Sequence, residues 1–193
     1  MQPADSGDRA PEYARMIEAL RGFLDSVAGA KPDTAIIERL TGELRRWTTE
    51  LAAAQVPERE QLFGRRRDLP GRGQTMIPAF VVAESCDDAT RGSVTFGRYF
   101  LGGNGAAHGG AITLLFDDVL GRVANAGGRR PARTAYLNVD YRAVTPLDTE
   151  LTVTGAFVKE EGRKRFVRGE LRNGETLCAE AEALFIELLP HHR

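Results

Sequence analysis

Residues 102–121, GGNGAAHGGAITLLFDDVLG, place a glycine-rich loop and a His-Gly-Gly triplet in front of an apolar stretch that contains two aspartates. The first turn of a helix has amide N–H groups without an internal partner, and glycine there lets a ligand approach closely. His108, Gly109 and Gly110 at a helix start would therefore polarise a carbonyl oxygen, as an oxyanion hole does. Glycines that only allow the helix to pack closely on a strand would explain the triplet equally well.

Asp117 and Asp118 interrupt the apolar helix at its middle, where aspartate is a poor helix former. Neighbouring residues on a helix point about 100° apart, so one carboxylate can face solvent while the other turns towards a buried site. A carboxylate in such a site needs a function or a partner to offset its desolvation. We interpret Asp117 as the functional acid, and Asp118 as the alternative if the helix register differs.

The spacing between His108 and Asp117 constrains how they can cooperate. Nine residues of ideal helix span about 13.5 Å and about 900° of rotation, which leaves the two side chains on opposite sides of the helix. One chain therefore does not bring both to one small reacting group. A two-fold dimer, in which the Gly110 amide of one chain meets Asp117 of the other, would do so.

A nucleotide site is the other use of a glycine-rich loop. The segment GNGAAH supplies two glycines of the dinucleotide motif but has His108 where the third belongs, and no Lys-Ser or Lys-Thr pair follows. The strands after the helix also follow one another directly, whereas a doubly wound sheet alternates strands with helices. We therefore reject a nucleotide fold.

Composition excludes several broad classes. The chain has 193 residues, 42% of them hydrophobic, with 26 basic and 27 acidic side chains, so its bulk charge does not favour nucleic acid. No apolar run reaches the roughly 20 residues of a membrane span, and the first ten residues do not resemble a secretory signal. We expect a cytoplasmic protein. Cys86 and Cys178 are too few for a metal site or disulfide framework, so we expect free thiols and no metal.

The sequence predicts two parts, an N-terminal helical extension with a linker over residues 1–70 and a main domain over residues 75–190. Apolar positions between Pro11 and Ala54 recur at helical spacing, and a break at residues 28–33 divides them into two helices with Asp33 as a cap. We expect both helices to pack on the main domain or its dimer. Residues 64–74 read as a solvated loop, although their arginine cluster would also suit a phosphate.

Alternating apolar residues replace the helical pattern from residue 75 onward. Two strands precede the central helix and four meandering strands follow it, and the last carries Ala179, Ala181 and Ala183 on one face with Glu182 on the other. Asn173-Gly174 supplies a two-residue hairpin turn. The predicted fold class is α+β, with one helix lying across one antiparallel sheet.

Residues 75–188 resemble the hot-dog fold thioesterases, in particular the phenylacetate-pathway type and its thioesterase-superfamily relatives. The resemblance rests on the His-Gly-Gly triplet at the central helix start, an aspartate nine positions on, and TAYLNVDYRAVTPL on the following strand. It implies an antiparallel sheet wrapped around the central helix, a homodimer of two such units, and in many relatives a dimer of dimers.

The resemblance also implies the roles of individual residues. The Gly110 amide would polarise the thioester carbonyl, and Asp117 would activate water or attack directly. His108 and Asn104 would orient the reactants, and Thr134 would place a hydroxyl near the catalytic carboxylate. The implied activity is hydrolysis of acyl-CoA to free acid and CoA, with CoA entering as part of the substrate and no separate cofactor.

Thioester hydrolysis also fits the residue types, because it needs a polarised carbonyl and an activated water. Gly109 would contact the substrate, and the CoA phosphates would meet basic residues after the helix or at a hairpin. These basic candidates are Arg129, Arg130 and Arg133 after the helix, and Arg163, Lys164 and Arg165 at the hairpin. A hot-dog hydratase motif is absent from the sequence. The alternative is a non-catalytic module that binds an acyl ligand, although such a module would not need the Asp117 carboxylate.

Overall fold

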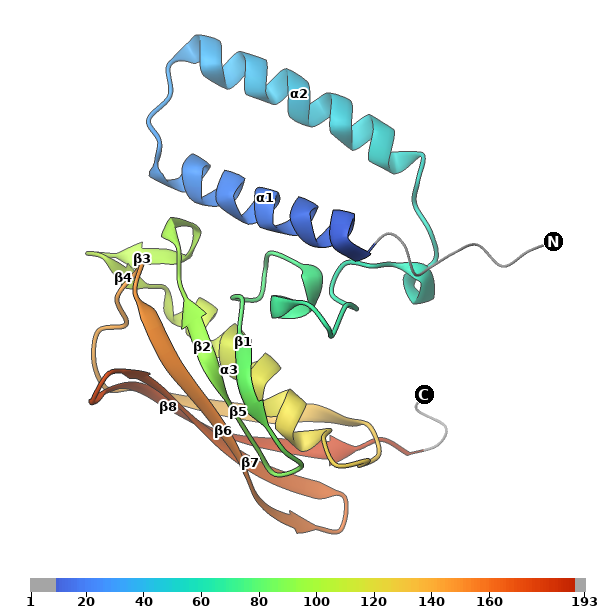
Figure 1. The fold of residues 1–193 in the computed structure, drawn as a ribbon, viewed down its shortest axis with the longest axis vertical. Helices are drawn as coiled ribbons and strands as arrows, with labels where there is room; N and C mark the ends of the chain where they lie inside the picture. Colours follow the sequence, from blue (N-terminus) through green and yellow to red (C-terminus); the bar gives the residue numbers. More distant parts are fainter. Residues whose placement is uncertain (1–9, 190–193) are drawn as a thin grey trace, which may run out of the picture.

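A six-stranded antiparallel sheet curves around one long helix in the computed structural model, which describes residues 10–189 (Figure 1). The helices are α1 (Ala10–Gly29), α2 (Thr34–Ala52) and α3 (Gly109–Ala124), and the short 3-10 helices are η1 (Glu58–Glu60), η2 (Pro70–Gly73) and η3 (Arg98–Phe100). The sheet consists of β1 (Val81–Ser85), β2 (Ala89–Thr95), β5 (Ala132–Tyr141), β6 (Glu150–Glu161), β7 (Lys164–Asn173) and β8 (Thr176–Glu187), and β3 (Leu101–Gly103) pairs with β4 (Ala106–Ala107). This is the α+β arrangement that the sequence predicts.

The strand order is β1-β2-β6-β7-β8-β5, so the predicted four-strand meander is only partly right. Strands β6, β7 and β8 follow one another as hairpins, but β5 lies at the far edge and pairs with β8 instead of β6. The alternation of apolar residues fixes which face of a strand is buried, whereas it carries no information on which strand lies next to it. As a result one edge of β5 has no partner strand in the described part of the chain.

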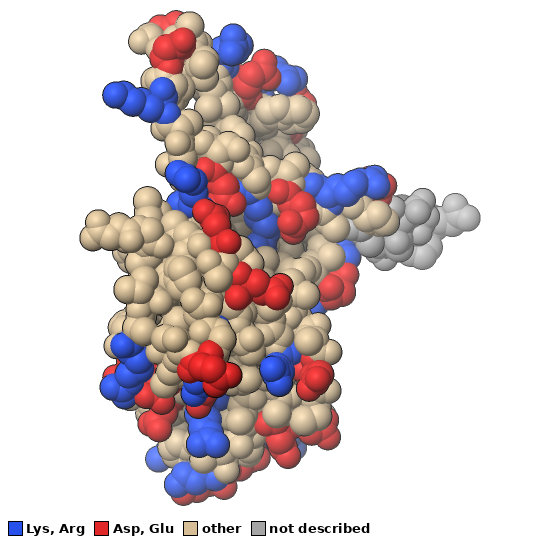
Figure 2. Space-filling view, turned by 60° about the vertical axis from the view of Figure 1, so that its left-hand side comes forward, with Lys and Arg blue, Asp and Glu red and all other residues tan. Residues whose placement is uncertain are grey.

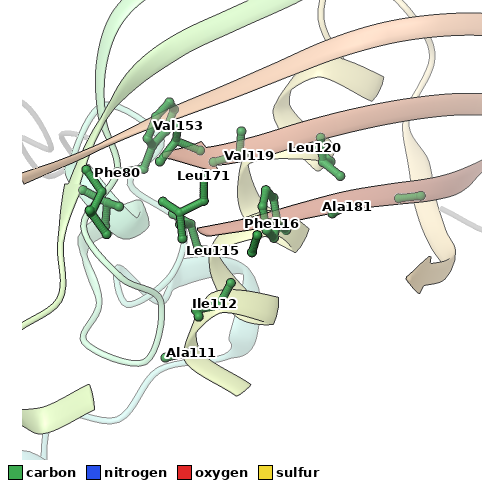
Figure 3. Packing of buried hydrophobic residues seen from close by; sticks show 14 of the residues in the cluster. Phe80, Ala111, Ile112, Leu115, Phe116, Val119, Leu120, Val153, Leu171 and Ala181 are labelled. Atoms are coloured by element: carbon green, nitrogen blue, oxygen red, sulfur yellow. The ribbon is translucent and has the colours of Figure 1, made fainter. Parts of the chain in front are cut away.

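The core forms where α3 packs against the concave face of the sheet. Figure 3 shows Leu115, Phe116 and Leu120 of the helix directed towards Leu171 and other strand residues. The sheet approaches α3 closely at Gly169, where an added Cβ would lie 3.1 Å from Leu120 and 3.2 Å from Phe116. These apolar contacts fix α3, and with it the two aspartates, relative to the sheet.

The last strand has the predicted one-sided pattern. Ala179, Ala181 and Ala183 are buried and Glu182 is exposed. The predicted hairpin turn is present but lies one residue later than expected, because Asn173 pairs with Thr176 and the two turn residues are Gly174 and Glu175. Gly174 adopts φ 55°, the left-handed region that glycine adopts readily. The alternation and the hairpin could thus be predicted from the sequence, whereas the exact turn residues could not.

The two predicted N-terminal helices are present, and their break lies where the sequence places it. Asp33 caps α2, and its carboxylate accepts a hydrogen bond from the Ile36 N–H at 2.9 Å.

Helix α1 packs on the rest of the chain as expected. Ile17 is buried, and the Tyr13 hydroxyl donates to the Gly73 carbonyl at 3.0 Å. At the other end of the helix, the Asp25 carboxylate accepts from the Tyr99 N–H at 2.8 Å. These bonds connect α1 to η2 and η3, so α1 is anchored at both ends.

Helix α2 does not bury its apolar stripe against the main domain of its own chain, contrary to the first of the two placements expected for both helices. It runs beside α1 in Figure 1 but has no buried residue, and its apolar stripe is exposed. The stripe consists of Ile36, Ile37, Leu44, Trp47 and Leu51. Packing of this stripe against a second copy remains a prediction.

The linker after these helices packs against the rest of the fold. The interpretation of residues 64–74 as a solvated loop is therefore wrong. Gly71, Gly73 and Gln74 are buried, and Arg72 reaches the Asp118 carboxylate on α3. The high content of charge and glycine suggested a surface segment, but Gly71 and Gly73 adopt positive φ and allow the chain to fold back against α1 and α3.

Arg21 holds this linker to α1, and its replacement by Ala is expected to lower the free energy of unfolding by about 1–3 kcal/mol. Its guanidinium donates to the carbonyls of Pro70, at 3.2 Å, and Gln74, and burial lowers its pKa. Loss of the side chain leaves both carbonyls without this donor. Urea unfolding measures the change.

Arg15→Ala is the matched control, because Arg15 is exposed and, among the described residues, its guanidinium is paired with Glu12 alone, at 2.7 Å. An exposed pair of this kind contributes about 0–1 kcal/mol. Equal effects of the two substitutions would contradict the anchoring role of Arg21.

Candidate functional site

Helix α3 begins at the His-Gly-Gly triplet, with His108 as its N-cap in an extended conformation. The His108 N–H donates to the Phe100 carbonyl at 2.7 Å, which ties the helix start to η3. The His108 Nδ1 accepts a hydrogen bond from the Gly110 N–H at 2.9 Å. The Gly110 amide is therefore occupied by the cap in this structure.

The Gly109 amide is free, since no acceptor for its N–H is found among residues 10–189. The carbonyl of Gly109, by contrast, accepts from the Tyr141 hydroxyl at 3.0 Å and from the Thr113 hydroxyl at 3.1 Å. These two bonds hold the first turn of α3 against the end of β5. Tyr141 is a contact that sequence reasoning missed, because nothing local to β5 indicates that it meets the helix start.

The two aspartates of α3 point in different directions, as their helical spacing predicts. Asp117 is exposed, and its Oδ1 accepts a hydrogen bond from the Thr134 hydroxyl at 2.7 Å. Asp118 is only 1% exposed. Of the two, Asp117 is the carboxylate that a substrate can reach.

Thr134 lies next to an irregularity in the edge strand. The β5–β8 register shifts between Thr134 and Tyr136, so Ala135 is an extra residue on the β5 side. A bulge of this kind changes the direction of the neighbouring side chains. The bulge thus lies directly beside Thr134, whose hydroxyl contacts the Asp117 carboxylate.

Asp118 forms a buried charge cluster with two arginines. Arg122, one turn later on α3, contacts it at 3.0 Å, and Arg72 reaches it from the linker. A buried carboxylate needs such partners because its desolvation is costly. The linker thus neutralises the charge next to Asp117.

Asp117 and Thr134 line a cleft of about 700 Å³. Its other lining residues are Arg67, Arg72, Gly121, Arg122, Asn125, Pro131, Ala132, Arg133, Phe185 and Leu188. His108, Gly109 and Gly110 are not among them. The structure therefore separates the helix start from Asp117 within one chain, as the nine-residue spacing predicts.

Asn104 occupies the tip of the β3–β4 hairpin and is exposed. It adopts φ 49° and Gly105 adopts φ 75°, the pattern of a two-residue Asn-Gly turn. This conformation by itself explains an asparagine here, and the Asn-Gly pair is its sequence signal. An orienting role for Asn104 in the reaction remains a prediction.

Of the six basic residues expected to meet the substrate phosphates, Arg133 lines the cleft and Arg165 is buried beside Glu160 and Glu187. The other four lie outside the cleft lining, and three of them already have partners. Arg129 donates to a backbone carbonyl of the β1–β2 turn at 2.5 Å. Arg163 donates to the Glu187 carbonyl at 2.9 Å, and Arg130 contacts the Glu187 carboxylate at 3.4 Å. Lys164 is exposed at the start of β7. Their role in substrate binding stays a prediction.

Neither a metal site nor a membrane-spanning helix is found in the part of the chain that the structure describes. Within residues 10–189, no group of three or more His, Cys, Asp or Glu side chains is arranged to hold a metal ion. None of the described helices has the length and apolarity of a membrane span. Basic and acidic side chains intermingle on the face shown in Figure 2, in line with a formal net charge of −1.

Residues 104–180 match the family model of the thioesterase superfamily. This segment contains α3 with its triplet and both aspartates, and the strands from β5 into β8. Over 96 residues the chain is 40% identical to acyl-coenzyme A thioesterase THEM4 of Mus musculus, which covers 49% of this chain and 41% of the mouse protein. The match thus spans less than half the length of that relative.

One solved structure extends the similarity to nearly the whole chain, and another shares the fold of its hot-dog part. A thioesterase superfamily protein, RHA08564, is 28% identical with a TM-score of 0.78, covering 96% of this chain and 97% of its own. The smu.793 protein of Streptococcus mutans UA159, bound to acetyl CoA, shares the fold at 21% identity and a TM-score of 0.53, over 55% of this chain and 86% of its own.

The match to RHA08564 reaches beyond the hot-dog part, because it covers nearly the whole chain, N-terminal helices included. These similarities do not separate the phenylacetate-pathway type from other relatives, so that narrower expectation stays a prediction. The family match covers residues 104–180, which include α3 and strands of the sheet that curves around it. The chain thus has the hot-dog fold, and its residues 104–180 are similar to the thioesterase superfamily.

Proposed function

We propose that this chain hydrolyses acyl-CoA thioesters to a free acid and CoA. The observation that carries the proposal is the exposed Asp117 carboxylate, which the Thr134 hydroxyl orients at 2.7 Å inside a cleft. This hydrogen bond holds the exposed carboxylate in one orientation, as a catalytic group requires. The name of the mouse relative and the acetyl CoA bound by the smu.793 protein support the same substrate class.

The carbonyl oxygen of the thioester would bind at the start of α3. The sequence assigns it to the Gly110 amide, but that N–H donates to His108 Nδ1 in this structure. We therefore place the oxygen on the Gly109 N–H, with the positive end of the helix dipole behind it. The hydrogen bond from the Gly110 N–H to His108 Nδ1 then holds the backbone of the first turn of α3 in place.

Asp117 would supply the base or the nucleophile. As a base, it removes a proton from water while the water oxygen attacks the carbonyl carbon, and the electron pair moves to the oxygen held at Gly109. The intermediate then collapses, the C–S bond breaks, and the CoA thiolate leaves and takes up a proton. As a nucleophile, Asp117 would form an acyl anhydride that water then hydrolyses to the same products.

The complete site would be shared by two copies of the chain. The cleft around Asp117 does not include the triplet, so the two halves of one site would come from different subunits. The free edge of β5 offers a place for the second copy, since an unpaired ten-residue edge strand readily pairs with another chain. We propose a homodimer on this basis, with a dimer of dimers as a further step.

Release of free thiol from short-chain, long-chain and aromatic acyl-CoA substrates, followed with a thiol reagent, tests the activity. We expect turnover of at least one class, with kcat in the common range of about 1–10³ s⁻¹. The rate should be unchanged by a chelator, because the proposed steps use only side chains and backbone amides. Absence of thiol release from every class, or loss of turnover on chelation, would contradict the proposal. Tight acyl-CoA binding without turnover would instead favour the non-catalytic binding module.

A further inference from the structure

Four arginines line the cleft that contains Asp117. Arg72 and Arg122 are held by the buried Asp118 carboxylate, as described above. The other two, Arg67 and Arg133, come from the linker and from the start of β5. Four guanidinium groups thus face two carboxylates, those of Asp117 and Asp118, which leaves the cleft with an excess of two positive charges.

Arg67 and Arg133 are the two cleft arginines that are available for a ligand. Both are exposed, and neither has a side-chain hydrogen bond or salt bridge to any residue among 10–189. Asp117, the remaining carboxylate of the cleft, is bonded to Thr134 instead. The cleft therefore presents two guanidinium groups whose charge the described part of the chain does not balance.

The neighbours of Arg67 behave differently, although the three arginines are consecutive. Arg65 contacts the Glu58 carboxylate at 2.6 Å, and Arg66 contacts Asp68, which raises the pKa of Arg66. Arg67 alone of the three lines the cleft. The sequence suggested that this arginine cluster could bind a phosphate. Arg67 is the member of the cluster whose side chain can meet a ligand in the cleft.

The unbalanced charge fits an anionic group on the substrate. Guanidinium groups bind phosphate through two parallel N–H donors, and such charge-assisted bonds are stronger than neutral ones. If the proposed function is right, every acyl-CoA substrate carries phosphates at the far end of its pantetheine arm from the thioester, whatever its acyl group. Of the basic residues expected from the sequence, Arg133 lines the cleft, whereas Arg129, Arg130 and Arg163 lie outside it and already have protein partners.

We infer that Arg67 and Arg133 bind phosphate groups of the CoA portion of the substrate. The inference rests on the proposed function and deepens it, because it brings the N-terminal segment into substrate recognition. The extension then does more than cover the hot-dog domain: it supplies one wall of the cleft through Arg67 and neutralises Asp118 through Arg72.

Arg67→Gln and Arg133→Gln test this assignment with two substrates that carry the same acyl group, an acyl-CoA and the corresponding acyl-pantetheine, which lacks the diphosphate and the nucleotide. We expect each substitution to raise KM for acyl-CoA about tenfold, with kcat within about twofold, since charged hydrogen bonds to a ligand are lost. The KM for acyl-pantetheine should not change. Arg65→Gln is the matched control, because Arg65 is paired with Glu58 and does not line the cleft.

Calorimetric titration with CoA and with pantetheine provides a readout that needs no turnover. Wild-type protein should bind CoA more tightly than pantetheine, and Arg67→Gln should remove most of that difference. Equal affinity of the wild type for the two ligands, or an equal rise in KM for both substrates, would overturn the phosphate assignment. If no substrate is hydrolysed but Arg67→Gln still weakens CoA binding selectively, the proposed activity fails while the phosphate site stands.

Discussion

Replacing Asp117 by Asn is expected to lower kcat for acyl-CoA hydrolysis by about 10² or more, because the amide is a far weaker base and nucleophile than the carboxylate. The side chain keeps its shape, and Asp117 is exposed, so the folded structure should persist. Its contact with the Thr134 hydroxyl at 2.7 Å can be retained by the amide oxygen. Steady-state kinetics with the best acyl-CoA substrate, together with thermal unfolding, measure both effects.

Asp140→Asn is the matched control, since Asp140 is an exposed carboxylate on β5 whose one ion pair within residues 10–189 is with Arg142, at 3.0 Å. Asp118→Asn should behave differently from both. It leaves Arg72 and Arg122 without their counter-charge and is expected to lower stability by about 3–5 kcal/mol, the range for breaking a buried pair. A larger loss of kcat per folded molecule in Asp118→Asn than in Asp117→Asn would mean that the wrong aspartate has been assigned.

Activity is expected to return when two inactive variants, Asp117→Asn and Gly109→Pro, exchange subunits. Proline at Gly109 removes the free N–H, and the backbone suits it, because His108 at φ −64° and ψ 133° has the conformation that a residue before proline favours. The Tyr141 side chain must shift slightly, since an added Cβ would lie 3.1 Å from its hydroxyl. Each mixed dimer then contains one intact site and one site damaged in both halves. Random mixing of equal amounts should recover about a quarter of the wild-type activity, because half of the dimers have one of two sites intact.

Gly110→Pro in the same experiment separates the two candidate amides, since that substitution removes the N–H that donates to the His108 Nδ1 cap. Mixing Asp117→Asn with Asp117→Ala is the negative control, because both variants damage the same half of the site. Native mass spectrometry of differently tagged chains shows whether mixed dimers form. Mixed dimers of Asp117→Asn and Gly109→Pro without activity would rule out a site shared in this way.

Several features of the site follow from short stretches of sequence. The helix start at His108, the turn at Gly174 and the cap at Asp33 depend on contacts within a few residues, so capping and turn chemistry predict them. The different directions of Asp117 and Asp118 also follow from helical geometry alone. The α+β fold class could be predicted for the same reason, since periodicity distinguishes the strands from α3.

Contacts between distant parts of the chain needed the tertiary structure. Arg72 and Asp118 are 46 residues apart, and no pattern around either residue indicates the other. The position of β5 at the sheet edge and the contact of Tyr141 with Gly109 depend in the same way on how the sheet closes around α3.

By itself, then, the sequence determined the chemical groups and their local directions: an amide-rich helix start, two carboxylates about 100° apart, and an arginine-rich linker. The tertiary structure decided which of these groups can act, because burial and partners depend on packing between distant segments. It enclosed Asp118 with Arg72 and left Asp117 open beside Thr134. It also occupied the Gly110 amide with His108, through a cap that a change in one side-chain torsion would remove.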